Sequence, residues 1–256
     1  MTPGLAVVIS LTGAIAARQS GALTPGGTIA AAGISAILLC STGWVGALVL
    51  TAFFLPSMLV GRVGPYQPTA GEAGTEVRSA AQVLANGGPA AAGGLAEFLA
   101  PGLGLWIASA SLAAASADTW ATSIGRFSRQ EPRLLGTRRR VPVGASGGVS
   151  LLGTFGGAAG AAAVAAPAAV ALRQPILFGV TFAIGMAGMF LDSALGGLAQ
   201  ATFVCPACAV PSERRQHQCG APTHLVKGWR WLDNDGVNAV TTLTAALTGA
   251  VAWFLR

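Results

Sequence analysis

Residues 149–200 read VSLLGTFGGAAGAAAVAAPAAVALRQPILFGVTFAIGMAGMFLDSALGGLAQ, which is two apolar runs separated by the turn Arg173-Gln174-Pro175. The first run holds no charged residue, and the second holds only Asp192. Each run is long enough to cross the hydrocarbon core of a bilayer as a helix, which takes about 20 residues. This stretch therefore predicts a pair of transmembrane helices joined by a short loop.

The rest of the chain has the same composition as this pair. Of its 256 residues 53% are hydrophobic and 9% are charged, whereas a typical soluble domain carries about 25% charged residues. The mean hydropathy is +0.63. These values exclude an ordinary soluble enzyme and predict a single all-α membrane domain over residues 1–256, a bundle of about seven or eight transmembrane helices. The expected helices cover residues 5–17, 27–39, 44–60, 80–99, 102–117, 149–172, 176–200 and 236–255.

Some of the expected helices carry unusual features. The first ends in Ala14-Ile15-Ala16, which resembles a secretory cleavage site, but no Lys or Arg precedes the apolar run, so we expect a retained helix. In the fourth, Asn86-Gly87-Gly88-Pro89 predicts a kink or an unwound turn at membrane depth. Small residues recur at helical spacing around Gly157 and Gly185, which predicts close contacts between helices.

The basic residues predict how the chain is oriented. With eight helices, all of the 15 Lys and Arg residues except Arg173 and Arg256 fall in loops on one side of the membrane. The positive-inside rule places these loops in the cytoplasm and both termini outside, in the cell inner membrane. The densest group lies in residues 126–140, and the net charge of +6 would attract anionic headgroups or a phosphorylated substrate.

Several acids occupy positions that are unfavourable in lipid. A carboxylate at the bilayer centre costs about 2.5–3.5 kcal/mol on insertion scales, so it is expected to face a partner or a cavity. Helix capping explains Asp233 and Asp235 at the start of the last helix, but it does not explain Asp118 and Asp192 together. The expected topology gathers the polar candidates in one cytoplasm-facing half of the bundle: Asn86, Asp118, Asp192, Asp233, Asn234, Asp235 and Asn238.

A Gly-rich stretch beside these acids leads from a triple-arginine loop into a helix. Residues 142–150 read PVGASGGVS and follow residues 138–140, which are all Arg. Backbone N–H groups in such a stretch can cradle a phosphate, although loop flexibility alone also explains the glycines, and there is no Walker A motif. Acids for Mg²⁺, arginines and a phosphate cradle are together the components of phosphoryl transfer. The candidate cofactor-binding residues are Arg78, Arg139, Arg140, Gly144, Gly147, Gly148 and Ser150, together with Asn234 and Asn238 from the polar group above.

The expected cytoplasmic loop at residues 201–235 holds three of the four cysteines. Cys205 and Cys208 form a C-x-x-C pair, and His217 and Cys219 follow within the same loop. This set suits tetrahedral Zn²⁺, and a reducing compartment disfavours a disulfide. The alternative is a group of reduced thiols in a surface loop. We expect a structural zinc ion at these four residues.

Seven stretches, in chain order, carry a resemblance to a known family: Ala22–Gly27, the helix with Phe53-Phe54, Arg78 with Gln82–Gly88, Ala117–Gly125, Pro142–Ser150, Asp192–Gly196 and Leu232–Asn238. They resemble the integral-membrane family known as domain of unknown function 92, which includes plant phytyl-phosphate kinase. The family pattern has Ser-Glu where this chain has Thr122-Ser123, so one acid of the pattern is missing.

The resemblance implies a membrane-embedded kinase, in which a nucleoside triphosphate such as CTP donates its γ-phosphoryl group to phytyl or another polyprenyl monophosphate. The four aspartates would hold Mg²⁺ beside Asn86, and the arginines and the glycine backbone would neutralise phosphate charge. The expected partners are the lipid bilayer, an isoprenoid phosphate and a nucleotide, with no nucleic acid. A transporter or flippase of a lipid phosphate or small anion is the main alternative, and a zinc-stabilised membrane scaffold is another.

Overall fold

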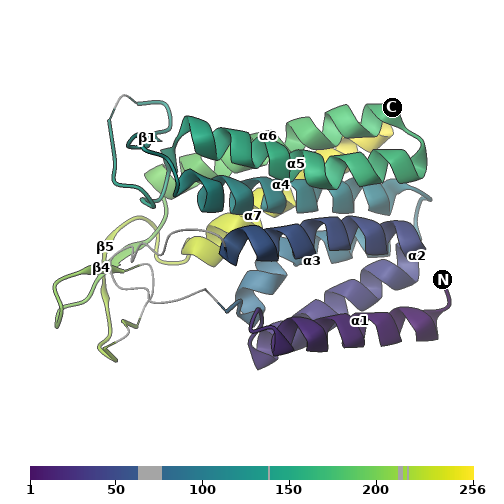
Figure 1. The fold of residues 1–256 in the computed structure, drawn as a ribbon, viewed down its shortest axis with the longest axis horizontal. Coiled ribbons are helices and arrows are strands. Elements are labelled where there is room, and N and C mark those ends of the chain that lie inside the picture. The colour runs from purple at the N-terminus through teal and green to yellow at the C-terminus, as the bar shows by residue number, and fades with distance from the viewer. Residues whose placement is uncertain (63–76, 138, 213–215, 218) are drawn as a thin grey trace.

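The computed structural model describes residues 1–62, 77–137, 139–212, 216–217 and 219–256. Within them the chain forms an all-α bundle of seven helices with two small antiparallel sheets at one end (Figure 1). The helices are α1 (Pro3–Gln19), α2 (Pro25–Arg62), α3 (Ala80–Ala96), α4 (Leu103–Gly125), α5 (Leu151–Leu172), α6 (Pro175–Leu198) and α7 (Asn234–Phe254). One sheet pairs β1 (Arg133–Leu134) with β2 (Gly148–Val149), and the other has the order β4 (Pro211–Ser212), β3 (Thr202–Val204), β5 (His224–Lys227).

Helix α2 consists of two antiparallel passes. Its 38 residues would extend about 57 Å if straight, nearly twice the ~30 Å hydrocarbon core. Gly43 has a non-helical backbone (φ 64°, ψ −141°) and lies beside the N-terminal nitrogen of Met1. At the other end of α2, Arg62 donates a hydrogen bond to the carbonyl of Ser20, just after α1. The chain therefore turns back at Gly43, and the helices expected at 27–39 and 44–60 are separated by one residue.

Both termini lie at the same end of the bundle, opposite the strands (Figure 1). At this terminal end, Gln174 accepts hydrogen bonds from Trp106 at 3.3 Å and from Arg256 at 3.4 Å. The other end, which carries both sheets, is called the strand end. The described basic residues except Arg173 and Arg256 lie at or near it, as the sequence predicted, while Arg138, Arg214 and Arg215 lie outside the described residues. Which compartment each end faces stays a prediction.

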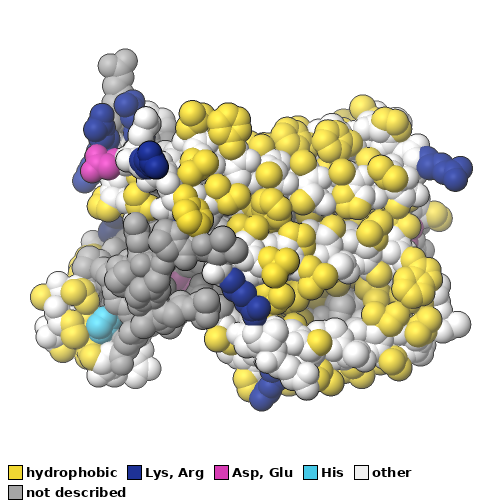
Figure 2. All heavy atoms as spheres, in the orientation of Figure 1, with side chains coloured by type: hydrophobic (Ala, Val, Ile, Leu, Met, Phe, Trp, Pro, Cys, Tyr) yellow, Lys and Arg dark blue, Asp and Glu magenta, His cyan; other side chains and the backbone are white. Residues whose placement is uncertain are grey.

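Exposed apolar side chains are spread over the face of the helical body that Figure 2 shows, and large ones are exposed on every helix except α4. An apolar surface of this extent is unfavourable in water and suits a lipid environment. By length and composition α2, α5, α6 and α7 could each cross a membrane. Helices α1 and α3 have 17 residues each, slightly fewer than the ~20 of a full span. The fold is therefore the predicted all-α membrane bundle.

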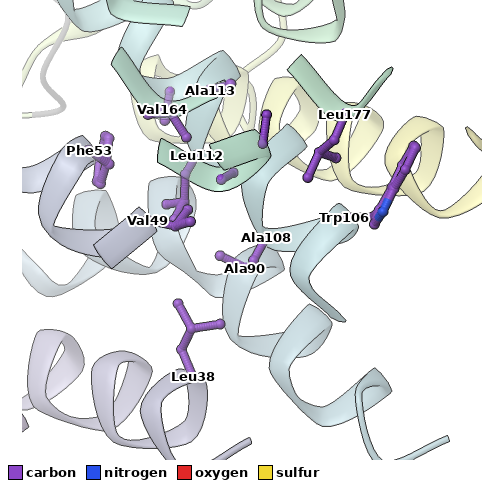
Figure 3. Close-up of a cluster of buried hydrophobic side chains, with 13 residues drawn as sticks. Leu38, Val49, Phe53, Ala90, Trp106, Ala108, Leu112, Ala113, Val164 and Leu177 are labelled. Atoms are coloured by element: carbon purple, nitrogen blue, oxygen red, sulfur yellow. The ribbon is translucent and has the colours of Figure 1, made fainter. Parts of the chain in front are cut away.

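Helix α4 is the centre of this bundle. It packs against α2, α3, α5, α6 and α7, and every residue from Leu103 to Ala117 except Ile107 is buried. Leu112, at its middle, belongs to a cluster of buried side chains contributed by the surrounding helices (Figure 3). Because other helices shield it from lipid, α4 can carry serines and an aspartate that a lipid-facing helix would place in hydrocarbon.

Glycines on α5 and α6 allow the close approach to α4. A Cβ atom added at Gly160 would lie 2.6 Å from the carbonyl oxygen of Ser116. One added at Gly185 would lie 3.1 Å from the Cβ of Ala113, and one at Gly157 would lie 3.2 Å from the carbonyl oxygen of Ala117. The close contacts predicted from the small residues around Gly157 and Gly185 are thus confirmed.

Helix α3 is continuous through Asn86–Pro89, so the prediction of an unwound turn there is wrong. Pro89 has no N–H, and the carbonyl of Ala85, four residues earlier, therefore lacks its helical donor. The hydroxyl of Thr242 on α7 lies 2.6 Å from this carbonyl and 2.9 Å from that of Asn238 in its own helix. A side chain from a neighbouring helix thus satisfies the freed carbonyl, which lets α3 run through the proline.

The hydrogen bond between the Thr242 hydroxyl and the Ala85 carbonyl can be tested by mutation. Thr242→Val preserves the side-chain volume and removes the donor, so we expect it to lower the free energy of unfolding by about 1–3 kcal/mol, because the Ala85 carbonyl stays buried without a partner. In a Pro89→Ala background residue 89 again supplies an N–H to that carbonyl, and the same change should cost much less. Thermal unfolding of both single variants and the double variant in detergent measures the difference. Equal costs in the two backgrounds would contradict the assignment.

One helix end differs strongly from expectation. Helix α4 continues to Gly125 instead of ending near Ala117, while the other ends agree within three residues. The extension remains packed on α5, since a Cβ at Gly156 would lie 2.9 Å from the carbonyl oxygen of Trp120. Asp118 therefore lies inside the helix, not at its end.

Candidate functional site

Four polar residues lie at one depth below the strand end. Asn86 on α3, Asp118 on α4, Asp192 on α6 and Thr241 on α7 are each six or seven residues from the strand-end terminus of their helix. At 1.5 Å per residue this is about 9–11 Å along each helix. Asn86 and the two aspartates are half-buried, and Thr241 is buried. We call these four residues the polar layer.

Contacts between α4, α6 and α7 support this common depth. A Cβ added at Gly188 would lie 2.6 Å from the Cβ of Ala114 and 3.5 Å from the methyl carbon of Thr241. Helices α4 and α6 run in the same direction, and Asp118 and Asp192 each follow these contact residues by four positions, about one turn. The hydroxyl of Thr241 lies 3.5 Å from Oδ2 of Asp192. The two acids are therefore level on neighbouring helices.

The acids at the start of α7 lie closer to the strand end. Asp233 is the N-cap, and its Oδ1 accepts a hydrogen bond from the Gly236 N–H at 3.1 Å. Asp235 is half-buried in the first turn, where the helix dipole favours a negative charge. Asn234 is exposed and Asn238 is half-buried one turn below it. Asp233 and Asp235 thus belong to the same end of the bundle as the polar layer but not to the same depth.

The Gly-rich loop approaches the polar layer through Gly147. A Cβ added there would lie 2.8 Å from the carbonyl oxygen of Ser193, the residue after Asp192, and still closer to the backbone of Gly197. Gly147 also has a φ of 80°, which glycine adopts without strain. A side chain at this position would push the loop away from α6. The structure therefore brings this part of the predicted cradle to the helix that carries Asp192.

Two other members of the predicted cradle have structural roles. The Gly148 N–H donates to the Ala145 carbonyl at 3.0 Å, which occupies that amide within the loop. The Ser150 hydroxyl accepts a hydrogen bond from the Gly153 N–H at 3.0 Å and caps α5. Gly144 is exposed, with a φ of 85°. The polar groups of Gly148 and Ser150 are thus engaged by the chain itself.

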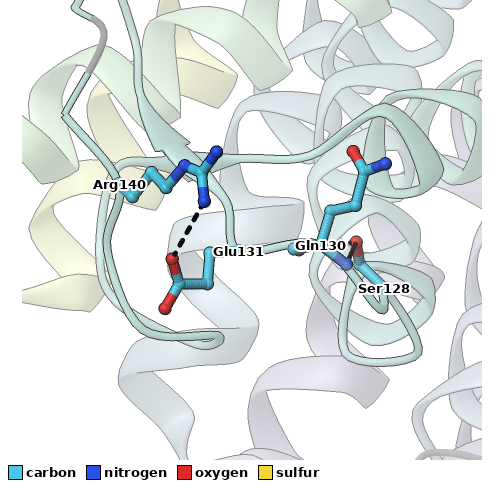
Figure 4. A network of polar contacts seen from close by, with 4 residues as sticks. All are labelled: Ser128, Gln130, Glu131 and Arg140. Atoms are coloured by element: carbon cyan, nitrogen blue, oxygen red, sulfur yellow. Dashed lines mark hydrogen bonds and ion pairs between the residues drawn. The ribbon is translucent and has the colours of Figure 1, made fainter.

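The predicted arginines are distributed around the strand end. Arg139 and Arg140 are exposed, and Nη1 of Arg140 lies 3.9 Å from Oε2 of Glu131 (Figure 4). The two side chains of this pair are 67% and 62% exposed, so the ion pair contributes little to stability. Arg78 is half-buried, and its backbone N–H donates to the Ala22 carbonyl at 3.0 Å. These residues place positive charge at the strand end of the bundle.

Two threonines of α7, Thr241 and Thr242, take part in this region and were not among the residues predicted from the sequence. Thr241 and Thr242 follow Asn238 by three and four positions, so all three lie on one helix face. This spacing of polar residues in an apolar helix was the available signal. Thr241 approaches Asp192, and Thr242 connects α7 to α3.

An apolar groove between α6 and α7 begins at the polar layer. Its lining includes Gly188 and Thr241 at that depth and Thr248 seven residues further along α7, about 10 Å toward the terminal end. Ala183 and Ala187 on its α6 side are exposed, so the groove opens toward the lipid-facing surface. The groove has a volume of about 310 Å³ and is lined by Ala183, Ile184, Ala187, Gly188, Leu191, Thr241, Thr244, Ala245 and Thr248.

The stretch predicted as a Cys/His loop contains β3, β4 and β5 and brings its four candidate ligands together. One ligand atom from each of Cys205, Cys208, His217 and Cys219 lies within 4.8 Å of the other three. The Sγ atoms of Cys205 and Cys219 are 3.6 Å apart, and Nδ1 of His217 is 3.2 Å from Sγ of Cys219. All four cysteines of the chain are unbonded thiols, with Cys40 in α2 away from this cluster.

The crowded thiols influence one another's ionisation. Burial opposes ionisation of Cys205, but hydrogen bonds from the Cys208 and Ala207 backbone and from the thiols of Cys219 and Cys208 outweigh it and lower the Cys205 pKa. The hydrogen bond with Cys219, burial and the neighbouring Cys205 raise the pKa of Cys208 to about 11. One ionised thiol thus disfavours ionisation of the next, as expected for like charges at short range.

The amino-acid sequence of this chain is similar to those of several membrane proteins. The family model described as integral membrane protein DUF92 matches residues 8–246. An uncharacterised membrane protein of Methanocaldococcus jannaschii is 29% identical over 200 residues, 76% of this chain and 82% of that protein. Protein PGR of Arabidopsis thaliana is 29% identical over 155 residues, 55% of this chain and 51% of PGR. An uncharacterised membrane protein of Synechocystis sp. is 28% identical over 231 residues, 88% of this chain and 80% of that protein. No solved structure matches the chain.

Proposed function

This chain belongs to the integral membrane protein family DUF92, and on that premise we propose that it is a membrane-embedded phosphotransferase. The reaction transfers the γ-phosphoryl group of a nucleoside triphosphate to phytyl or another polyprenyl monophosphate. A phosphate oxygen of the lipid bonds to the γ-phosphorus, and the bond from that phosphorus to the β–γ bridging oxygen breaks. The products are the lipid diphosphate and a nucleoside diphosphate.

The observation that carries this proposal is the pair of acids Asp118 and Asp192 at one depth on adjacent helices. A carboxylate about 9–11 Å below the helix ends is costly in lipid unless it faces a partner or a polar cavity. Two carboxylates at that level would hold Mg²⁺, whose charge would offset that of the transferring phosphates. Asp235, nearer the strand end, would extend the acidic surface toward the nucleotide.

The surrounding charges fit a phosphorylated ligand at the strand end. Gly147 brings the Gly-rich loop to the helix of Asp192, and its lack of a side chain allows that approach. Exposed Arg139 and Arg140 at the same end would neutralise phosphate charge. The acceptor oxygen belongs to a phosphate, which is already ionised near neutral pH, so positioning and charge neutralisation are the main requirements.

The groove between α6 and α7 fits the apolar part of the substrate. A lipid whose phosphate lies at the polar layer could place its tail along the groove from Thr241 toward Thr248. The exposure of Ala183 and Ala187 lets such a tail enter sideways from the bilayer. The isoprenoid character of the tail comes from the family resemblance, and the groove requires only an apolar chain.

Transport is the competing function, and the structure weakens its main support. That support was a broken helix at Asn86–Pro89, which is continuous in the structure. The acid at the terminal end, Glu97, is a helix cap, since its two oxygens accept hydrogen bonds from the N–H groups of Gly102 at 2.7 Å and Gly104 at 2.9 Å. The acids of the polar layer and of the α7 start all lie toward the strand end, which favours a site open to one side.

The direct test is incubation of the purified protein in proteoliposomes with γ-labelled nucleotides and a panel of polyprenyl monophosphates. We expect labelled lipid diphosphate that forms only when both Mg²⁺ and a matching lipid are present. Absence of product with every nucleotide, together with movement of the lipid phosphate across the vesicle membrane, would replace the kinase with a flippase.

The same assay can test the groove between α6 and α7 with one variant and a matched control. Ala187→Phe places a ring in the groove, and we expect a higher KM for long-tailed substrates with kcat retained, because the tail loses room but the phosphates do not. Ala166→Phe adds the same ring to an exposed position of α5 outside the groove and should leave both constants unchanged. Equal effects from the two variants would remove the groove from the proposal.

A further inference from the structure

We propose that Cys205, Cys208, His217 and Cys219 bind one structural Zn²⁺ ion, which holds the β3–β5 sheet together and thereby sets where α7 begins. The proposal is independent of the phosphotransferase activity, because it concerns the metal content and folding of residues 199–233. It assigns a role to three of the four cysteines that the proposed reaction does not use.

The ligand geometry matches a tetrahedral site. With Zn–S bonds of ~2.3 Å and Zn–N bonds of ~2.0–2.1 Å, tetrahedral ligand atoms lie about 3.6–3.8 Å apart. The observed separations are 3.6 Å between two of the sulfurs and 3.2 Å between a sulfur and Nδ1 of His217, with all four ligand atoms within 4.8 Å. Three thiolates and one imidazole complete a closed structural zinc site and are poor ligands for Mg²⁺ or Ca²⁺, which prefer oxygen.

Two tight turns present these ligands in pairs. In the first, the Ala209 N–H donates to the Cys205 carbonyl at 2.9 Å, which brings Cys205 and Cys208 to one side of the turn. In the second, the Gly220 N–H donates to the His217 carbonyl at 2.9 Å, around Cys219. Ala209 has a φ of 56°, a left-handed conformation that costs a residue with a side chain about 1–2 kcal/mol. Such strain persists where the surroundings hold the turn in place, which a bound ion would do.

A buried nitrogen provides independent support. Nε2 of His217 is buried and has no hydrogen-bond partner among the described residues. A buried polar atom without a partner costs about 1–3 kcal/mol. Either ring nitrogen can serve as the ligand, and coordination of Zn²⁺ by Nε2 would give that atom a partner and remove this cost.

The sheet itself buries few apolar side chains. All four residues of β5 are exposed, and the buried side chains of β3 and the following turn are those of Phe203 and Cys205. A unit this small seldom folds on hydrophobic burial alone and commonly depends on a metal or a disulfide. Because the cysteines are unbonded thiols, the metal is the stabilising element that these residues can supply.

The sheet is hydrogen-bonded to the helices on both sides. The Ala201 N–H donates to the Leu232 carbonyl at 2.8 Å, directly before the cap residue Asp233. The Trp229 N–H donates to the Ala199 carbonyl at 2.9 Å, and Nζ of Lys227 donates to the Gly197 carbonyl at 2.7 Å. An ion that stabilises the sheet therefore also stabilises the first turn of α7.

The test is metal analysis of the full-length protein, purified in detergent without chelators. We expect about one zinc per chain, which is lost in the double variant Cys205→Ser/Cys208→Ser. Cys40→Ser is the matched control, since Cys40 lies in α2 outside the cluster, and it should retain the ion. His217→Cys keeps four ligands and should also retain zinc, which separates loss of a ligand from misfolding.

Hydrogen exchange supplies a second readout. Removal of the ion should raise exchange in β3–β5 and in the first turn of α7 and leave α4 and α5 unchanged. Wild-type protein without zinc, full zinc content in the double variant, or a Cys205–Cys219 disulfide in protein kept under reducing conditions would overturn the proposal.

Discussion

We expect Asp118→Asn and Asp192→Asn each to reduce Mg²⁺-dependent lipid diphosphate formation by about 100-fold or more while the protein stays folded. Asparagine has nearly the same volume as aspartate but lacks the charge that would hold a divalent cation. Loss of one preorganised electrostatic group at a reacting centre commonly costs about 10²–10³ in rate. Product formed per folded molecule, together with the melting temperature of each variant, measures the effect.

Glu97→Gln is the matched control for these two variants. Glu97 is also an acid within the bundle, but it lies at the terminal end and caps α4. Its neutralisation weakens charge-assisted hydrogen bonds to two backbone N–H groups, so we expect a lower melting temperature with unchanged activity per folded molecule. Full specific activity in both aspartate variants would remove the acids from the mechanism and with them the observation on which the proposed function depends.

The second large effect concerns the contact between α4 and α5. We expect Gly160→Ala to lower the free energy of unfolding by about 1–3 kcal/mol, as overpacking of a tight interface does. The new Cβ would lie 2.6 Å from the carbonyl oxygen of Ser116 and 2.9 Å from Cγ of Trp120. A backbone atom on one side and an indole ring on the other leave the methyl group no room, so the two helices must separate.

Gly33→Ala is the matched control, because it makes the same substitution at a glycine with open space around it. Gly33 is an exposed residue of α2, and a Cβ there would meet nothing within 4 Å. We expect this variant to be neutral or more stable by about 0.5–1 kcal/mol, because alanine is the better helix former. Thermal unfolding in one detergent compares the pair. A gain in stability for Gly160→Ala would show that α4 and α5 are not in close contact at this position.

Several features of this protein could be predicted from local sequence alone. The helices follow from apolar runs of about 20 residues, because a chain in hydrocarbon must satisfy its backbone hydrogen bonds within each helix. The basic loops at one end follow from counting charges between those runs. The Cys/His cluster was also predictable, since its ligands span only residues 205–219 and two turns suffice to bring them together.

The position of each helix among its neighbours was not predictable in this way. Hydropathy marks α4 as one more apolar segment, yet it is the central helix, and its extension to Gly125 moves Asp118 into the polar layer. The predicted break in α3 is absent because Thr242, 157 residues away from Ala85 in the chain, replaces the missing donor. In a bilayer most helix faces are apolar, so composition does not say which face meets which partner. Close packing at particular glycines and single hydrogen bonds between distant residues make that choice, and these form only when the whole bundle is assembled.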